Sequence, residues 1–194
     1  MTHIKDLEFD VMKKNLSAGT RAKLRAWTEG VIFATDSPDT KHGLWLFGER
    51  RAGTSYTAKV VVADLAVQHG LTDSHQVRAL DLIDMVRGSW SMSAQVRSSM
   101  DDLALWWELK NTEEMLDTYF WRLDVLWIDQ LHHETIDMAM WKKHIQPRIE
   151  ARVEEGMITV ISTTMTPGDR ALPKNVIEDL FTTILCEDRF DAGR

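Results

Sequence analysis

Three short apolar runs, separated by longer segments with helical spacing, constrain the fold of this chain more than any other feature. The runs cover residues 44–47, 124–129 and 157–163, and residues 77–80 form a weaker fourth candidate. Short apolar or β-branched runs are typical of strands that are buried on both faces of a parallel sheet. Strands that alternate with helices therefore predict an α/β fold, a three-layer sandwich with a mainly parallel sheet and right-handed crossovers.

Helical patterns fill most of the chain between these runs. The predicted helices cover residues 54–69, 93–107, 112–121, 135–155 and 173–186. Thr112 is followed by two glutamates, which favours a helix start at this residue. Pro147 lies inside the fourth predicted helix and should kink or split it, because proline removes a main-chain donor.

The segment before the first run has a different character. A helical pattern covers residues 4–27, and residues 36–42 have the composition of a loop. We expect residues 1–42 to form an N-terminal helical extension that packs on a single compact domain, residues 43–194. The length of 194 residues suits one such domain.

Charge and cysteine content narrow the class of protein. The net charge of −7 argues against a whole-surface attraction to nucleic acid. Basic clusters within residues 13–25 and 142–152 leave a local basic groove open, although solvated helix faces explain them more simply. The single cysteine, Cys186, excludes an internal disulfide framework and a multi-cysteine zinc site. Without a signal-like apolar core or a membrane-length run, the chain is expected to be cytoplasmic.

The loop after the first run carries a phosphate-binding pattern. Gly48 and Gly53 have the spacing of G-x-x-x-x-G-K-[ST], and a helix follows at once. Such glycines permit a tight loop whose backbone N–H groups point at phosphate oxygens. The nucleotide-binding candidates are Gly48, Glu49, Arg50, Arg51, Ala52, Gly53, Thr54 and Ser55.

At one position the residue differs from the one that the G-x-x-x-x-G-K-[ST] pattern requires. Ser55 stands where a hydroxyl would ligate Mg²⁺, but Thr54 stands where the lysine belongs. That lysine holds phosphates and offsets the charge that develops in phosphoryl transfer. Threonine is uncharged, and a neutral hydrogen bond is about half as strong as a charge-assisted one. Arg50 or Arg51 could compensate from within the loop, and Lys59 is a poorer candidate.

The second and third runs each end in candidate site residues. Asp129 closes the second run in the form of a Walker B strand, whose aspartate orients Mg²⁺. The next position normally carries an acid that activates water, but here it is Gln130, and Glu134 is a weak displaced alternative. The third run ends in small polar residues like a sensor strand. Thr164 best matches the sensor position, and Thr163 is the second choice.

The order and spacing of these landmarks resemble the DnaC/IstB-like branch of the AAA+ P-loop ATPases, which includes replicative helicase loaders. The matching segments are GLWLFGERRAGTSYTAKVVVADLA at 43–66, DVLWIDQL at 124–131, ITVISTTMTP at 158–167 and LPKNVIEDLF at 172–181. The resemblance therefore runs from residue 43 to the C-terminus and implies an AAA+ core. It also implies ATP or ADP as ligand, with Mg²⁺ held by Ser55 and Asp129.

The same resemblance implies a replicative helicase or another replication protein as the partner. The closing helix of this family usually carries an arginine that reaches the ATP of a neighbouring subunit, and Asp179 stands at the matching position. Lysine, catalytic acid and arginine are thus all replaced. We expect a degenerate ATPase of the helicase-loader type, with nucleotide binding weak or lost. A bacteriophage replication accessory protein would fit this description.

Other functions stay open at this point. An active but atypical ATPase would use Arg50 or Arg51 in place of the lysine and Glu134 as base. A P-loop module that binds and inhibits a host protein needs no nucleotide. A small-molecule kinase is less favoured, because no arginine-rich lid follows the third run. Self-association and weak DNA binding are also left open.

Several other residues have simpler structural explanations. Trp106, Trp107, Trp121, Trp127 and Trp141 lie on apolar faces or in a strand, so core packing is expected for most of them. Adjacent His132 and His133 point in divergent directions without a third ligand, which disfavours a metal site. Cys186 is expected to be a buried or half-buried residue, not a nucleophile.

Overall fold

The computed structural model describes residues 16–33, 40–98, 103–132, 136–167 and 174–186. A five-stranded sheet lies at its centre, in the order β2-β3-β4-β1-β5, and all its strand pairings are parallel. The strands are β1 (Gly43–Phe47), β2 (Ser74–Arg78), β3 (Val125–Leu131), β4 (Ile158–Thr163) and β5 (Phe181–Leu185). The three apolar runs correspond to β1, β3 and β4, which confirms the predicted parallel sheet.

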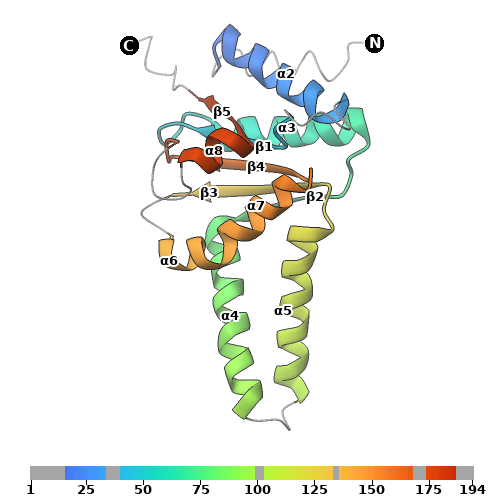
Figure 1. Ribbon diagram of the computed structural model, residues 1–194, viewed down its shortest axis with the longest axis vertical. Helices are drawn as coiled ribbons and strands as arrows, with labels where there is room; N and C mark the ends of the chain where they lie inside the picture. The colour runs from blue at the N-terminus through green and yellow to red at the C-terminus, as the bar shows by residue number, and fades with distance from the viewer. Residues whose placement is uncertain (1–15, 34–39, 99–102, 133–135, 168–173, 187–194) are drawn as a thin grey trace.

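Helices cover both faces of the sheet, so the predicted three-layer sandwich is confirmed (Figure 1). On one face lie α2 (Ala18–Phe33) and α3 (Thr54–His69), and the remaining helices lie on the other. Strand β1 shows why helices must cover both faces of the sheet. Leu44 and Leu46 join the core under α2 and α3, whereas Trp45 joins the opposite core. Alternate side chains of a strand face opposite sides, so a strand between two helical layers must be apolar throughout.

Helices α4 (Ala79–Ser98) and α5 (Leu103–Trp121) form a long hairpin that projects away from the sheet (Figure 1). The predicted boundaries in this region are wrong. Residues 79–92 are helical, and Thr112 lies inside α5 instead of starting a helix. Its hydroxyl donates to the Glu108 carbonyl oxygen at 2.9 Å, the usual bond of a threonine within a helix. The weak strand candidate at 77–80 is likewise shifted, since β2 ends at Arg78.

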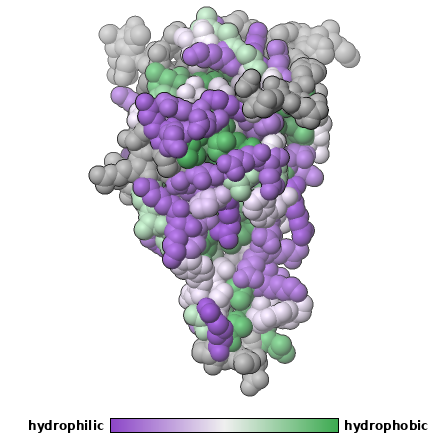
Figure 2. Space-filling view, viewed as in Figure 1, coloured by the Kyte–Doolittle hydropathy of each residue, from purple (hydrophilic) through white to green (hydrophobic). Residues whose placement is uncertain are grey.

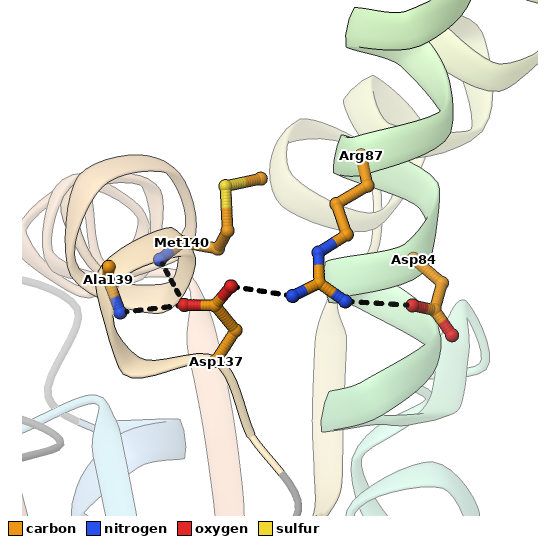
Figure 3. Close-up of polar contacts among 5 residues, drawn as sticks. All are labelled: Asp84, Arg87, Asp137, Ala139 and Met140. Atoms are coloured by element: carbon orange, nitrogen blue, oxygen red, sulfur yellow. Dashed lines mark hydrogen bonds and ion pairs between the residues drawn. The ribbon is translucent and has the colours of Figure 1, made fainter.

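The predicted helix around Pro147 is not one regular α-helix, although its elements adjoin without a break. The segment divides into α6 (Met138–Met140), the π-helical turn η2 (Trp141–Ile145) and α7 (Gln146–Glu154). Proline is tolerated in the first turn of α7 because its missing N–H has no helical partner there. Asp137 caps α6 by accepting from the N–H groups of Ala139 and Met140 (Figure 3). Its other oxygen accepts from Arg87 of α4 at 2.6 Å, which joins the hairpin to α6.

The predicted helix at 173–186 is wrong in its second half. Helix α8 covers only Lys174–Leu180, and the chain then enters β5 at the edge of the sheet. Val176, Ile177, Leu180, Phe181 and Ile184 have helical spacing, but Phe181 and Ile184 belong to the strand. Pairing of β5 with β1 decides the outcome, since Phe181 lies opposite Gly43 and Ile184 opposite Leu46. Two β-branched threonines inside the strand are consistent with it.

Helix α2 packs on the sheet, as expected for the N-terminal segment, and it continues to Phe33, beyond the predicted end at Trp27. Its buried side chains Leu24 and Trp27 share a core with Val61 of α3. The indole N–H of Trp27 donates to the Lys41 carbonyl oxygen at 2.8 Å, which ties α2 to the entry of β1. Residues 1–15 lie outside the described residues, and the boundary at residue 42 stays a prediction.

A buried arginine fastens the base of the hairpin. Arg152 of α7 is fully buried, and its guanidinium donates to the carbonyl oxygens of Phe120, Leu123 and Ile158 and to the Thr159 hydroxyl. Phe120 lies near the end of α5, and Ile158 and Thr159 begin β4. The Arg152 side chain therefore joins α7 to α5 and β4. Burial lowers the pKa of Arg152 to about 10. The guanidinium still stays charged at neutral pH, held by main-chain dipoles.

Half of the eight tryptophans are not core residues. Core packing is confirmed for Trp127 and Trp141, and it is wrong for Trp106, Trp107 and Trp121, which are exposed on α5.

No helix of the described residues is long and apolar enough to cross a membrane.

Candidate functional site

The carboxyl ends of the parallel strands bring the three sequence landmarks to one edge of the sheet. Strand β1 leads into the glycine loop, β3 ends beyond Asp129, and β4 ends just before Thr164. In open α/β sheets this edge is where ligands bind. The order of the strands places β4 between β1 and β3, so its end lies between the loop and the Walker B-like residues.

The loop between β1 and α3 has a tight backbone with two residues in the left-handed region. Gly53 has φ 82°, and Arg51 has φ 73°. The Ala52 N–H donates to the Glu49 carbonyl oxygen at 3.0 Å, which closes the turn. A left-handed conformation costs a residue with a Cβ atom roughly 1–2 kcal/mol, so the fold maintains this loop against the preference of Arg51.

Gly48 is required at the start of the loop by a close approach. A Cβ atom at this position would lie 2.3 Å from the Cys186 carbonyl oxygen and 2.9 Å from the Ala52 Cβ. The Cys186 N–H also donates to the Phe47 carbonyl oxygen at 2.7 Å, so the end of β5 is fixed against the loop. The first glycine of the pattern therefore has a packing role that the sequence alone did not reveal.

Ser55 and Asp129, the two predicted Mg²⁺ ligands, meet at this edge. The Ser55 hydroxyl, in the first turn of α3, donates to Asp129 Oδ1 at 2.6 Å. Asp129 is only 2% exposed, although it is an acidic residue. A buried carboxylate needs hydrogen-bond donors, since leaving it unpaired is costly.

Two residues that sequence reasoning missed supply part of this support. Gln76 of β2 donates to Asp129 Oδ2 at 2.9 Å, and Ser162 of β4 donates to Oδ1 at 2.5 Å. The Gln130 N–H also donates to Oδ1, at 2.9 Å, so with Ser55 the carboxylate accepts four hydrogen bonds. Ser162 in turn accepts from the Trp127 indole N–H at 3.0 Å. A lone serine within the apolar run of β4 was the available sequence signal.

The positions that would carry catalytic charge hold neutral side chains. Thr54 begins α3, partly buried, and Gln130 is exposed beyond Asp129 with φ 58°. Ser55, Gln76 and Ser162, the side chains that donate to Asp129, are also uncharged. Arg50 and Arg51 are exposed on the loop.

The two sensor candidates differ in what their hydroxyls do. Thr163 is fully buried, donates to the Leu131 carbonyl oxygen and accepts from the Met165 N–H at 2.9 Å. Its hydroxyl thus holds β4 to the end of β3. Thr164 is partly buried and lies 3.1 Å from His132 Nδ1. Of the two hydroxyls, only that of Thr164 contacts an ionisable side chain, the His132 imidazole. This contact was not predicted from the sequence.

The remaining candidates fall away from this cluster or outside the described residues. Glu134 and His133 lie outside them. Asp179 is exposed on α8, and Lys59 is exposed on α3. Within the described ranges there is no group of three or more His, Cys, Asp or Glu residues that could hold a metal. Cys186 is buried, as expected, and burial raises the pKa of its thiol to about 11.

Comparisons with known proteins place this geometry in a known fold. No family model matches the chain, and no curated protein matches it. Among solved structures, the DnaC helicase loader is similar with a TM-score of 0.57 and 15% identity, over 88% of this chain and 92% of that one. Domain III of the Thermotoga maritima replication initiation protein DnaA is similar with a TM-score of 0.52 and 11% identity. That match covers 87% of this chain and 63% of the DnaA chain. The chain therefore shares the α/β fold of the helicase loader and of the initiator domain, which confirms the fold class predicted from the sequence.

Proposed function

We propose that this protein is a DNA-replication accessory protein of the helicase-loader type that binds a replication protein and no longer hydrolyses ATP. One observation carries the proposal. Ser55 and Asp129 meet at 2.6 Å within a helicase-loader fold, while Thr54 and Gln130 occupy the positions of the lysine and the catalytic acid. The scaffold of the site is present, and its catalytic charges are replaced.

The residues at the site fit a magnesium ion better than they fit a triphosphate. A hydroxyl and a carboxylate are oxygen ligands that Mg²⁺ accepts, and Ser55 and Asp129 would hold it. The ion would supply charge to bound phosphates. Neutral Thr54 offers only a weak substitute for the lysine.

Nucleotide as a structural ligand is favoured by the backbone of the loop. Arg51 keeps a left-handed conformation that its side chain disfavours, which is the kind of strain that functional sites retain. Arg51 is also exposed on the loop, where its guanidinium can attract phosphate. This supports weak nucleotide binding without turnover.

The test is a binding measurement between the purified full chain and the replicative helicase that copies the same genome. We expect a complex that forms with or without Mg-ATP, because the proposed role does not depend on hydrolysis. A Ser55→Ala variant should bind the helicase as well as the parent does. The proposal fails if neither the helicase nor an initiator protein nor DNA binds the chain.

A further inference from the structure

Strand β5 forms one edge of the sheet, and among the described residues no strand lies on its outer side. The strand order places only β1 beside it. Its sequence, FTTIL, contains no proline and no charged residue, whereas β2 at the opposite edge carries the charged Arg78. Natural proteins usually block an edge strand with charge or proline, because a free edge pairs with other chains. The β5 edge lacks both of these blocks.

The pairing of β5 with β1 fixes which of its main-chain groups face outward. The Cys186 N–H donates to the Phe47 carbonyl oxygen at 2.7 Å, so Cys186 faces β1. Successive residues of a strand turn their main-chain groups to opposite sides, so Ile184 also faces β1. The N–H and C=O groups of Thr183 and Leu185 therefore point away from the sheet. They bond to no other main-chain group of the described residues.

A groove of about 730 Å³ lies along this edge and includes Thr183 in its lining. Helix α2 lies beside β5 and supplies one wall, and Glu178 of α8 belongs to the other (Figure 1). In the space-filling view, apolar and hydrophilic side chains meet in this part of the molecule (Figure 2). Since α2 and α8 pack on opposite faces of the sheet, the groove continues the layer of the sheet itself. An extended chain fits such a space better than a helix does, because strands lie about 4.7–4.9 Å apart and a helix is roughly 10–12 Å wide.

The α2 wall of the groove is made of small residues. Gly30 lies inside α2, where glycine destabilises a helix relative to alanine. A Cβ atom at Gly30 would meet nothing within 4 Å, so packing among the described residues does not require a glycine there. Ala26, one turn earlier, also lines the groove. These two residues leave room for another main chain to approach α2 closely.

Two lysines give the groove a positive charge. Lys23 and Lys41 both line it. The Lys41 ammonium donates to the Glu178 carbonyl oxygen, and Lys23 forms no ion pair with a described residue. The Glu178 carboxylate is itself paired with Lys174 at 3.4 Å. The groove is therefore positive in a chain whose net charge is −7, which favours an acidic occupant.

Backbone and charge together select the class of occupant. A free strand edge recognises an extended peptide through main-chain hydrogen bonds. Nucleic acid would meet the lysines, but it has no row of amide groups to pair with Thr183 and Leu185. A second copy of β5 carries no acidic residue to face the lysines.

We propose that the outer edge of β5 binds an extended acidic segment of a partner protein, which adds to the sheet as a sixth strand. Thr183 and Leu185 pair with its main chain, and Lys23 and Lys41 hold its carboxylates. The proposal goes beyond the function proposed above and does not depend on it, because the surface recognises backbone and charge.

The experiment uses a dye-labelled synthetic octapeptide in which valine and glutamate alternate. Fluorescence polarisation measures its affinity for the full chain, for Gly30→Leu and for the matched control Gly88→Leu, a glycine inside α4 that does not line the groove. We expect Gly30→Leu to bind the peptide at least about tenfold more weakly than the parent, and the control to stay within about twofold. Circular dichroism checks that both variants keep their helical content.

The peptide itself supplies further readouts. Methylation of its alternate amide nitrogens removes the donors that pair with β5 and should abolish binding. A valine–lysine octapeptide should bind the parent at least about tenfold more weakly. In NMR, the valine–glutamate peptide should slow hydrogen exchange at the Thr183 and Leu185 amides. Exchange at the Ile184 amide, which faces β1, should stay unchanged.

Several results would overturn the proposal. The octapeptide could fail to bind, or its binding could be unchanged by amide methylation and by Gly30→Leu. Displacement of the peptide by a single-stranded oligonucleotide would assign the lysines to nucleic acid. A dimer of the parent that Gly30→Leu separates would show that a second copy occupies the edge.

Discussion

The Ser55 hydroxyl lies 2.6 Å from Asp129 Oδ1, although 74 residues separate the two along the chain. This contact joins the glycine loop to the end of β3. The same carboxylate accepts from Gln76 and Ser162, so this hydrogen-bonded cluster is assembled from three strands and one helix. Thr54 and Gln130 carry no charge, and on the function proposed above the cluster would hold an ion without the groups that drive turnover.

Replacement of Thr54 by lysine should restore tight nucleotide binding. A hydrogen bond to a charged group contributes about 1.5–3 kcal/mol, against about 0.5–1.5 kcal/mol for a neutral one. We therefore expect Thr54→Lys to bind Mg-ATP about tenfold more tightly than the parent in calorimetry. Thr54→Met is the matched control, because it adds length without charge. Equal affinities for the two variants would show that the missing charge is not what limits binding.

Removal of the Asp129 carboxylate should destabilise the fold. Asp129→Ala leaves the donors of Ser55, Gln76 and Ser162 without their acceptor. A buried donor left unsatisfied costs about 1–3 kcal/mol, so the free energy of unfolding in urea should fall by at least that amount. Asp179→Ala, an exposed change on α8, should stay within about 0.5 kcal/mol. A stable Asp129→Ala protein would mean that water replaces the carboxylate.

Loss of the buried Arg152 guanidinium should lower the stability of the fold more than loss of the Asp129 carboxylate does. Arg152→Met keeps an apolar stem but removes every donor to the carbonyl oxygens of Phe120, Leu123 and Ile158. Breaking a buried charged network costs about 3–5 kcal/mol. We expect a loss of this size in urea unfolding, with Arg97→Met, an exposed change on α4, as the control. A loss below about 1 kcal/mol, the size of an ordinary substitution, would show that Arg152 does not fasten the hairpin.

Stability should fall in mildly alkaline solution through Cys186. Burial raises the pKa of its thiol from 9.0 to about 11, so the folded protein retains a proton that the unfolded chain releases. The resulting stability is complete below pH 9 and is lost as the pH rises through 11. The difference in unfolding free energy between the parent and Cys186→Ala should shrink by roughly 2 kcal/mol between about pH 8 and 10.5. A difference that stays constant over this range would contradict the burial of the thiol.

The amino-acid pattern was sufficient to predict the central layer of the fold and the residues that meet at its edge. β1, β3 and β4 are buried on both faces, so their apolar runs are unambiguous. Ser55 and Asp129 could be paired because each stands at the Mg²⁺-ligand position of its motif, the glycine loop and the Walker B strand. The glycine pattern likewise predicted a tight loop, and Gly53 within it has a left-handed backbone with φ 82°.

The peripheral elements could not be predicted, because tertiary contacts decide them. Phe181 and Ile184 have helical spacing, and only their pairing opposite Gly43 and Leu46 makes β5 a strand. Trp106 and Trp107 are large apolar residues of the kind that usually pack in a core. They lie on the hairpin, which projects away from the sheet, and they are exposed there. Gln76 gave no signal of its role, since its contact with Asp129 spans 53 residues.

Steady-state ATP turnover tests the central claim most directly. The measurement compares the parent chain with Asp129→Ala, in the presence of Mg²⁺, with and without the replicative helicase. Our account predicts that the two proteins release phosphate at the same background rate under both conditions, because Thr54 and Gln130 supply no catalytic charge. Turnover by the parent that Asp129→Ala abolishes would contradict the account and establish an active, atypical ATPase.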